Sequence, residues 1–361
     1  MTDLLPFVTL SLMPRSAWCE AAERLRRGSA AETVLELVLA GRGKDGPGYA
    51  SRLRSRAAAA IQAGRSQRVT VVSWNDAAYP PALTTIADPP FVLWVRGVAA
   101  SLSTPAVAIV GARAASPYAL AVAERLAADL AGAGLTVVSG LARGVDSAAH
   151  RGAIGAGGTT IGVLGSGIDV IYPPEHQPLV RDIEQSGAVI SELVPGTVPQ
   201  PRFFPMRNRI ISGLTRAVVV IEAGEKSGSL ITARCALEQG RDVLAVPGNV
   251  LSGRNRGAHA LLRDGATIVE SVDDILAELG MSPAARSVGA NGGCDERCRG
   301  GRAADPVLHC LTPGEPANLD EIAERSGLSP SRLLPRLFEL ELQGAIARVG
   351  GGRFVRVDSS C

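Results

Sequence analysis

The segment from Arg202 to Arg216 combines aromatic rings with unpaired positive charge. Phe203 and Phe204 stand side by side near its start. Four arginines lie in the same segment with no carboxylate between them: Arg202, Arg207, Arg209 and Arg216. Aromatic residues make up only 4% of the chain and its formal net charge is +2, so this concentration is unusual here. Rings that stack bases beside guanidinium groups that bind phosphates predict a nucleic-acid contact, although a buried aromatic pair beside a solvated arginine helix explains the segment equally well.

Glycine-rich turns follow five short apolar runs of the chain. Glycine lets the backbone approach a ligand closely, and a helix that begins after such a turn offers free amides to an anion. One glycine after a strand is usually a simple turn, but five such turns at one edge of a sheet predict a phosphate-binding rim. The turns are Gly111–Arg113, Ser139–Asp146, Gly165–Gly167, Glu222–Ser229 and Pro247–Asn249.

Signatures of bound cofactors are missing from these turns. Gly111–Ser116 lacks the second and third glycines of the dinucleotide fingerprint, and the spacing before Ser227 is not that of a Walker A loop. We therefore expect neither bound NAD nor ATP hydrolysis. The four histidines are spread without metal-ligand spacing, and Cys294 with Cys298 matches no standard zinc pattern, so no metal is expected.

Catalytic groups are few. His150 could act as a general base, but a hydrogen-bonded structural histidine is the favoured interpretation. Glu222, which follows an apolar run and precedes a glycine-rich turn, is the best candidate acid. It could equally accept hydrogen bonds from the amides of neighbouring loops.

The elements that must position these residues follow an alternating pattern. Short apolar runs alternate with helical patterns, which predicts an α/β fold: a Rossmann-like, mostly parallel sheet with helices on both faces. The predicted strands lie at 69–72, 91–95, 107–110, 136–138, 160–164, 188–190, 217–221, 242–246 and 267–269.

Composition divides the chain into four parts. We predict a small helical N-terminal domain over 1–66, the Rossmann-like domain over 67–280 and a flexible linker over 281–306. Residues 307–361 show a helix, a turn at Gly327, a second helix with Ser329 as N-cap, and a hairpin, which together predict a winged helix. Its charges are balanced, so contact with a protein is as plausible as contact with duplex DNA.

Six scattered cysteines, the lack of an apolar run of about 18 residues and an N-terminus without a secretory pattern predict a cytoplasmic protein without membrane contact.

Several of these segments resemble, in the correct order, the motifs of the DprA (Smf) DNA-processing family. The similar segments are Val107–Arg113, Ser139–Asp146 with Ala149-His150, Ile168–Pro173, Phe204–Ile211, Glu222-Ala223 with Ser227–Ala233, and Val246–Gly248. They span roughly residues 69 to 280, and the C-terminal winged helix looks like that family's own. The resemblance implies a homodimer without enzymatic activity that binds and protects single-stranded DNA and promotes loading of RecA recombinase in DNA uptake, natural transformation and recombination.

The resemblance also implies roles for single residues. Phe204 would stack a base, and Arg113, Arg202, Arg207 and Arg209 would contact or frame phosphates. Ala112 stands where the family usually has serine or threonine, and Arg202 is the nearest match to a basic residue that the family carries just before the aromatic. The full predicted single-strand-binding set is Gly111, Arg113, Ser139, Gly140, Arg143, Gly165, Arg202, Phe204, Arg207, Asn208, Arg209, Glu222, Ser227, Gly228 and Ser229.

Two other functions remain open from the sequence. One is a nucleotide-binding enzyme on the same core, similar to a phosphoribohydrolase, with Glu222 as its acid. The other is a protein whose winged helix makes the main contact, with duplex DNA or with another protein.

Overall fold

The computed structural model describes residues 3–41, 48–281, 306–311, 317–342, 345–349 and 353–356. The chain forms two compact units, Met1–Arg286 and Ser287–Cys361. The predicted linker and the cysteines Cys294 and Cys298 lie outside the described residues. Within the described residues, no helix has the length and apolar character needed to cross a membrane, and no cluster of potential metal ligands occurs.

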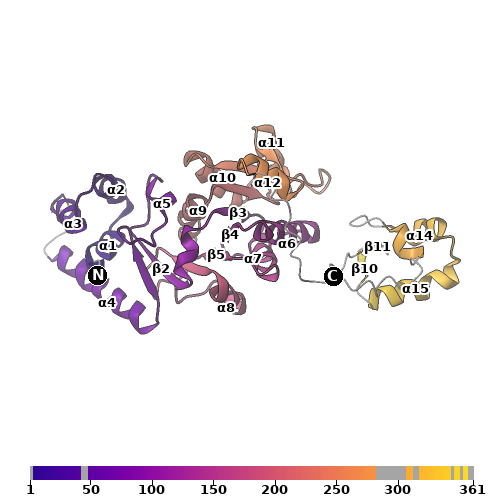
Figure 1. Cartoon of the computed structure of the whole chain (residues 1–361), viewed down its shortest axis with the longest axis horizontal. Helices are drawn as coiled ribbons and strands as arrows, with labels where there is room; N and C mark the ends of the chain where they lie inside the picture. Colours follow the sequence, from indigo (N-terminus) through magenta and orange to yellow (C-terminus); the bar gives the residue numbers. More distant parts are fainter. Residues whose placement is uncertain are drawn as a thin grey trace. The chain divides into compact units, whose positions relative to one another are not determined.

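A nine-stranded sheet forms the centre of the first unit (Figure 1). The strands from β3 onward run parallel, whereas β2 is antiparallel to both β1 and β6. In spatial order the strands are β1 (Thr70–Ser73), β2 (Val92–Gly97), β6 (Ala188–Ser191), β5 (Thr160–Val163), β4 (Thr136–Ser139), β3 (Ala106–Val110), β7 (Ala217–Val220), β8 (Asp242–Ala245) and β9 (Thr267–Ile268). The predicted fold class is confirmed.

Helices cover both faces of this sheet, as the fully apolar central strands require. Along β3, Val107 and Ile109 pack with α6, α7 and α12, whereas Ala108 and Val110 pack with α9, α10 and α11. The helices of this region are α5 (Pro81–Thr84), α6 (Pro117–Gly132), α7 (Val145–Gly155), α8 (Gln177–Ser186), α9 (Phe203–Gly213), α10 (Ser229–Glu238), α11 (Arg256–Arg263) and α12 (Val272–Glu278).

The N-terminal helices pack directly on the sheet. They are α1 (Leu4–Ser11), α2 (Trp18–Arg26), α3 (Ala31–Ala40) and α4 (Tyr49–Ser66). Phe7, Leu35 and Trp18 share one hydrophobic cluster with Phe91 and Trp94 of the sheet region. The helical region is therefore part of the same compact unit as the sheet.

The C-terminal unit has its own apolar core, in which Ile322, Leu337 and Phe354 are buried. Asn318 and Glu321 form a reciprocal capping box at the start of α14, and Gly327 ends that helix with a left-handed backbone (φ 67°). Its elements are α13 (Pro306–Cys310), α14 (Leu319–Ser326), α15 (Pro330–Leu342) and the antiparallel pair β10 (Ile346–Val349) and β11 (Arg353–Arg356).

Candidate functional site

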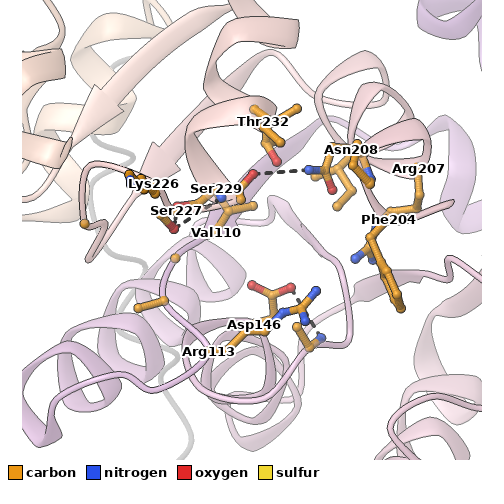
Figure 2. A pocket seen from close by; sticks show the side chains of 18 of the residues that line it. Val110, Arg113, Asp146, Phe204, Arg207, Asn208, Lys226, Ser227, Ser229 and Thr232 are labelled. Carbon is orange, nitrogen blue, oxygen red and sulfur yellow. Dashed lines mark hydrogen bonds between the residues drawn. The ribbon is translucent and has the colours of Figure 1, made fainter. Parts of the chain in front are cut away.

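A cavity of about 790 Å³ opens at the carboxyl ends of β3 and β7. The chain order of the strands reverses between these two neighbours, which is where open α/β sheets bind ligands. Figure 2 shows Phe204 on one side of the cavity and Lys226 with Ser227 on the other. Eight residues of the predicted set line it: Gly111, Arg113, Phe204, Arg207, Asn208, Ser227, Gly228 and Ser229.

An aromatic and cationic cluster forms the side of the cavity nearest β5. The guanidinium carbon of Arg113 lies 5.2 Å from the ring centroid of Phe204, which is 5.6 Å from the ring centroid of Tyr172. Gly165, which follows β5, is buried under Phe204, since a Cβ there would lie 3.0 Å from the ring. Tyr172 is 38% exposed and Arg113 is exposed, so the cluster offers ring surface and positive charge to a ligand.

A second pair of the same kind lies just outside this cavity. The guanidinium carbon of Arg202 is 5.0 Å from the ring centroid of Phe203, the first residue of α9. Neither side chain lines this cavity, although Pro201 and Phe204, on either side of the pair, do. The structure therefore places Arg202 beside the cavity and does not bring it together with Arg113.

Arg207 lines the cavity as a buried side chain. Its Nη1 donates to the carbonyl oxygen of Gly140 at 2.5 Å and to that of Val163. Burial lowers the pKa of Arg207 to about 10, and the nearby Asp146 carboxylate opposes this shift. Burial likewise raises the pKa of Asp146, which accepts the amides of Gly140 (3.1 Å) and Ala142 (3.3 Å). Arg207 thus remains a cation at neutral pH and holds the turn after β4 and the carboxyl end of β5.

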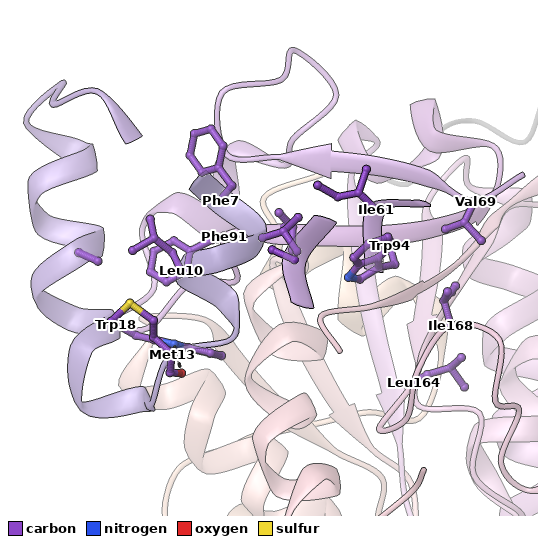
Figure 3. Packing of buried hydrophobic residues seen from close by; sticks show 14 of the residues in the cluster. Phe7, Leu10, Met13, Trp18, Ile61, Val69, Phe91, Trp94, Leu164 and Ile168 are labelled. Atoms are coloured by element: carbon purple, nitrogen blue, oxygen red, sulfur yellow. Dashed lines mark hydrogen bonds between the residues drawn. The ribbon is translucent and has the colours of Figure 1, made fainter. Parts of the chain in front are cut away.

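The prediction that Arg209 contacts or frames a phosphate needs correction. Its Nη2 donates to Glu192 Oε2 at 2.5 Å and its Nε to Asp88 Oδ2 at 3.1 Å, and the side chain is 5% exposed. The guanidinium also stacks 5.7 Å from the ring of Trp18, which packs against Phe91 in the core under the N-terminal helices (Figure 3). Arg209 therefore links α9 to the N-terminal helices and does not line the cavity.

The wall opposite Phe204 is formed by the turn before α10. The hydroxyls of Ser227 and Ser229 lie 2.7 Å apart, and Asn208 Nδ2 donates to the carbonyl of Gly228 at 3.3 Å. Lys226 lines the cavity, is exposed, and has no ion pair among the described residues. This wall offers hydroxyls, one ammonium group and the N-terminus of a helix, which together suit an anion.

Two other predicted residues serve the scaffold. The Ser139 hydroxyl donates to the carbonyl of Ile109 at 2.6 Å, inside the sheet. Glu222 accepts the amide (3.1 Å) and hydroxyl (2.6 Å) of Ser116, the N-cap of α6, and is only 5% exposed. Both are corrected from ligand contacts to supports of the loops. Gly140 and Arg143 border a smaller hollow next to Phe204, where Arg143 pairs with Glu175 at 2.5 Å.

Sequence reasoning missed several residues of the cavity. Lys226 lies in a loop that lacks the Walker spacing, and Tyr172 lies in the motif Ile168–Pro173; neither belongs to the predicted set. Asp146 and Thr232 also line the cavity. The scarcity of aromatic residues in the chain was the signal that could have identified Tyr172.

His150 has no access to the cavity. It is fully buried on α7, its Nδ1 lies 2.7 Å from the hydroxyl of Thr160, and burial lowers its pKa to about 3. Asp146 is the sole carboxylate among the residues that line the cavity, and loop amides already occupy it. The arrangement is therefore suited to binding a strand with bases and phosphates rather than to acid–base catalysis.

Two protein-family models match the chain. The family described as DNA recombination-mediator protein A matches residues 70–280, and the DprA winged helix domain matches residues 301–352. Protein Smf of Escherichia coli (strain K12) is 40% identical over 288 residues, covering 78% of this chain and 76% of Smf. DNA processing protein DprA of Streptococcus pneumoniae (strain R6) is 46% identical over 212 residues, covering 59% of this chain and 75% of that protein.

Solved structures give the same result. The X-ray structure of DprA from Streptococcus pneumoniae aligns with a TM-score of 0.67 at 36% identity, covering 77% of this chain and 99% of that one. DNA processing protein A from Helicobacter pylori, whose structure is described for its single-stranded DNA binding mode, aligns with a TM-score of 0.53 at 30% identity, covering 58% of this chain and 95% of that one.

Proposed function

The chain belongs to the DprA (Smf) family of DNA-processing proteins, and from this membership we propose that it binds single-stranded DNA in the cavity between β3 and β7. The observation that carries the proposal is the cluster of Arg113, Phe204 and Tyr172 at one side of that cavity. Every base has a face that can stack on a ring, so such a cluster binds a strand without reading its sequence. Lys226 and the turn before α10 then lie within the same cavity to receive phosphates.

The finer function follows from the same membership. We propose that the protein protects incoming single-stranded DNA and promotes RecA loading in DNA uptake, natural transformation and recombination, in the cytoplasm and without catalysing a reaction. The RecA partner rests on the family resemblance alone. A homodimer has support from the edge strand β9, where Ile268 is 53% exposed, because an apolar residue at an unpaired sheet edge is a surface that a second copy can cover. The domain boundaries at 66, 280 and 306 are part of this proposal.

Fluorescence anisotropy with a labelled oligothymidine tests the binding site. Phe204→Leu should weaken binding roughly 5- to 150-fold, since one base stack is worth about 1–3 kcal/mol. Phe203→Leu is the matched control, because its ring sits under Arg202 outside the cavity, and it should bind as the parent does. If Phe204→Leu stayed within twofold of the parent, the proposed site would be wrong.

The rival function, a phosphoribohydrolase-like enzyme, depends on Glu222. Both oxygens of that carboxylate accept hydrogen bonds from Ser116, which leaves the non-enzymatic proposal better supported. If the parent turned over nucleoside monophosphates and Glu222→Gln abolished this turnover, the enzyme would become the better supported function.

A further inference from the structure

The rim of the cavity continues beyond β7, on the side away from Phe204. Phe204 lies over the turn after β5, whereas β8 is the next strand after β7 in the sheet. Neighbouring strands are about 4.8 Å apart, so the carboxyl ends of β5 and β8 are separated by roughly 19 Å. Residues 247–255, which we call the β8 loop, follow β8 at this edge and precede α11.

The β8 loop is fixed to the wall of the cavity. Asn255 is buried and its side-chain oxygen accepts the amide of Ala223 at 3.1 Å, and the amide of Gly257 donates to the carbonyl of Ala223 at 2.8 Å. Ala223 directly precedes the turn that lines the cavity. The loop therefore holds a defined position relative to the proposed DNA site.

Arg254 extends from this loop to the turn after β3. Its Nη1 donates to the carbonyl of Ala114 at 2.9 Å, and Ala114 is the residue after Arg113. Arg254 is exposed and forms no ion pair with any of the described residues. A guanidinium carries five N–H donors, so this single contact orients Arg254 and leaves donors for a phosphate.

Tyr118 lies beside the same loop. It is the second residue of α6, and its hydroxyl is 3.5 Å from the carbonyl oxygen of Pro247, the first residue of the β8 loop. The side chain is 56% exposed, more than any other described aromatic residue of the first unit. A ring that reaches the loop with its hydroxyl end and is open to solvent contributes little to the core, but it is a surface on which a base can stack.

We propose that Tyr118 and Arg254 form a second subsite for single-stranded DNA, reached when the strand leaves the cavity across β7 and passes over the β8 loop. This inference rests on the proposed function and extends its site. Tyr118 stacks a base and Arg254 binds a neighbouring phosphate. At the tip of the loop, Leu251 is 93% exposed and adds apolar surface along the same path. The subsite lengthens the covered strand without adding sequence preference, because it contacts base faces and backbone.

Two oligonucleotide lengths separate the subsite from the cavity. Anisotropy is measured with labelled dT4 and dT20 on the parent, Tyr118→Leu and Arg254→Gln. Tyr118→Leu should bind dT20 about fivefold or more weakly, with dT4 unchanged within twofold. Arg254→Gln should also reduce the slope of log K against log salt for dT20 by about 0.7, one phosphate contact on a single strand. Arg256→Gln is the control, because this neighbouring exposed arginine pairs with Glu225 at 3.7 Å.

Each other result overturns the inference. Equal losses for dT4 and dT20 would mean that the two residues support the cavity itself. If both variants bound dT20 as the parent does, the β8 loop would not contact DNA. This is the result expected if the apolar tip of the loop binds a protein partner instead. Two results would instead refute the proposed function. In the first, the parent binds neither oligonucleotide. In the second, the parent binds both, and Phe204→Leu does not weaken the binding of either.

Discussion

Arg113 lies over the ring of Phe204, 5.2 Å from its centroid, although Arg113 follows β3 and Phe204 is the second residue of α9. The contact keeps a phosphate-binding group directly beside a base-stacking group. A cation over a ring is attracted by about 0.5–1 kcal/mol at an exposed site, so the pair is partly ordered before a ligand arrives.

Arg113→Gln should weaken single-strand binding and lower its salt dependence. Loss of one phosphate contact should reduce the slope of log K against log salt by about 0.7. Anisotropy titrations at several salt concentrations measure both effects. Arg202→Gln removes the guanidinium of the matching pair outside the cavity and should leave the slope as in the parent; a lowered slope there as well would show that the measurement reports overall charge.

Gly140→Ala should displace the buried Arg207 guanidinium. A Cβ at position 140 would lie 2.4 Å from Nη1 of Arg207, a contact that forces the side chain off its two carbonyl acceptors. Leaving such groups unpaired costs about 1–3 kcal/mol, which urea unfolding would detect. Gly132→Ala is the control, since a Cβ there meets nothing within 4 Å. Equal stability of the Gly140 variant and the parent would contradict this account of Arg207.

Arg209→Met should destabilise the fold without changing the salt dependence of DNA binding. It leaves Glu192, 4% exposed at its side chain, without its cationic partner, and breaking such a buried pair costs about 3–5 kcal/mol. Urea unfolding measures the loss, and anisotropy on the folded variant measures the slope. Arg24→Met removes an exposed pair with Glu20 and should change stability little. If Arg209→Met lowered the slope of log K against log salt, Arg209 would contact a phosphate after all.

Acid should weaken the fold through His150. Burial lowers its pKa to about 3, from 6.5, so the unfolded chain binds a proton in a range where the folded chain does not. The stability that neutral His150 contributes is complete above about pH 6.5 and is lost as the pH falls toward 3, at about 1.4 kcal/mol per pH unit. Urea unfolding between pH 7 and pH 5 should therefore show a shallower pH dependence for His150→Gln than for the parent. Identical slopes would exclude His150 as the cause.

The sequence by itself determined the fold and the edge of the sheet at which the cavity lies. Uninterrupted apolar runs such as Ala217–Val220 have to be buried on both faces, which requires a parallel sheet between helix layers. Turns at the carboxyl ends of parallel strands must meet at one edge, so Gly111, Arg113 and Ser227 were expected together, and the structure brings them into one cavity.

Only the tertiary structure decided which arginines face that cavity. Arg207 and Arg209 are two positions apart on α9, a rotation of about 200° around the helix axis, so they point to opposite sides. Arg207 reaches the turn after β4 and the carboxyl end of β5, whereas Arg209 reaches Glu192 and Trp18. Sequence spacing gives this relative rotation but not the absolute orientation of the helix, which depends on packing against segments far away in the chain. For the same reason, Tyr172 joined the site only once the fold placed it beside Phe204.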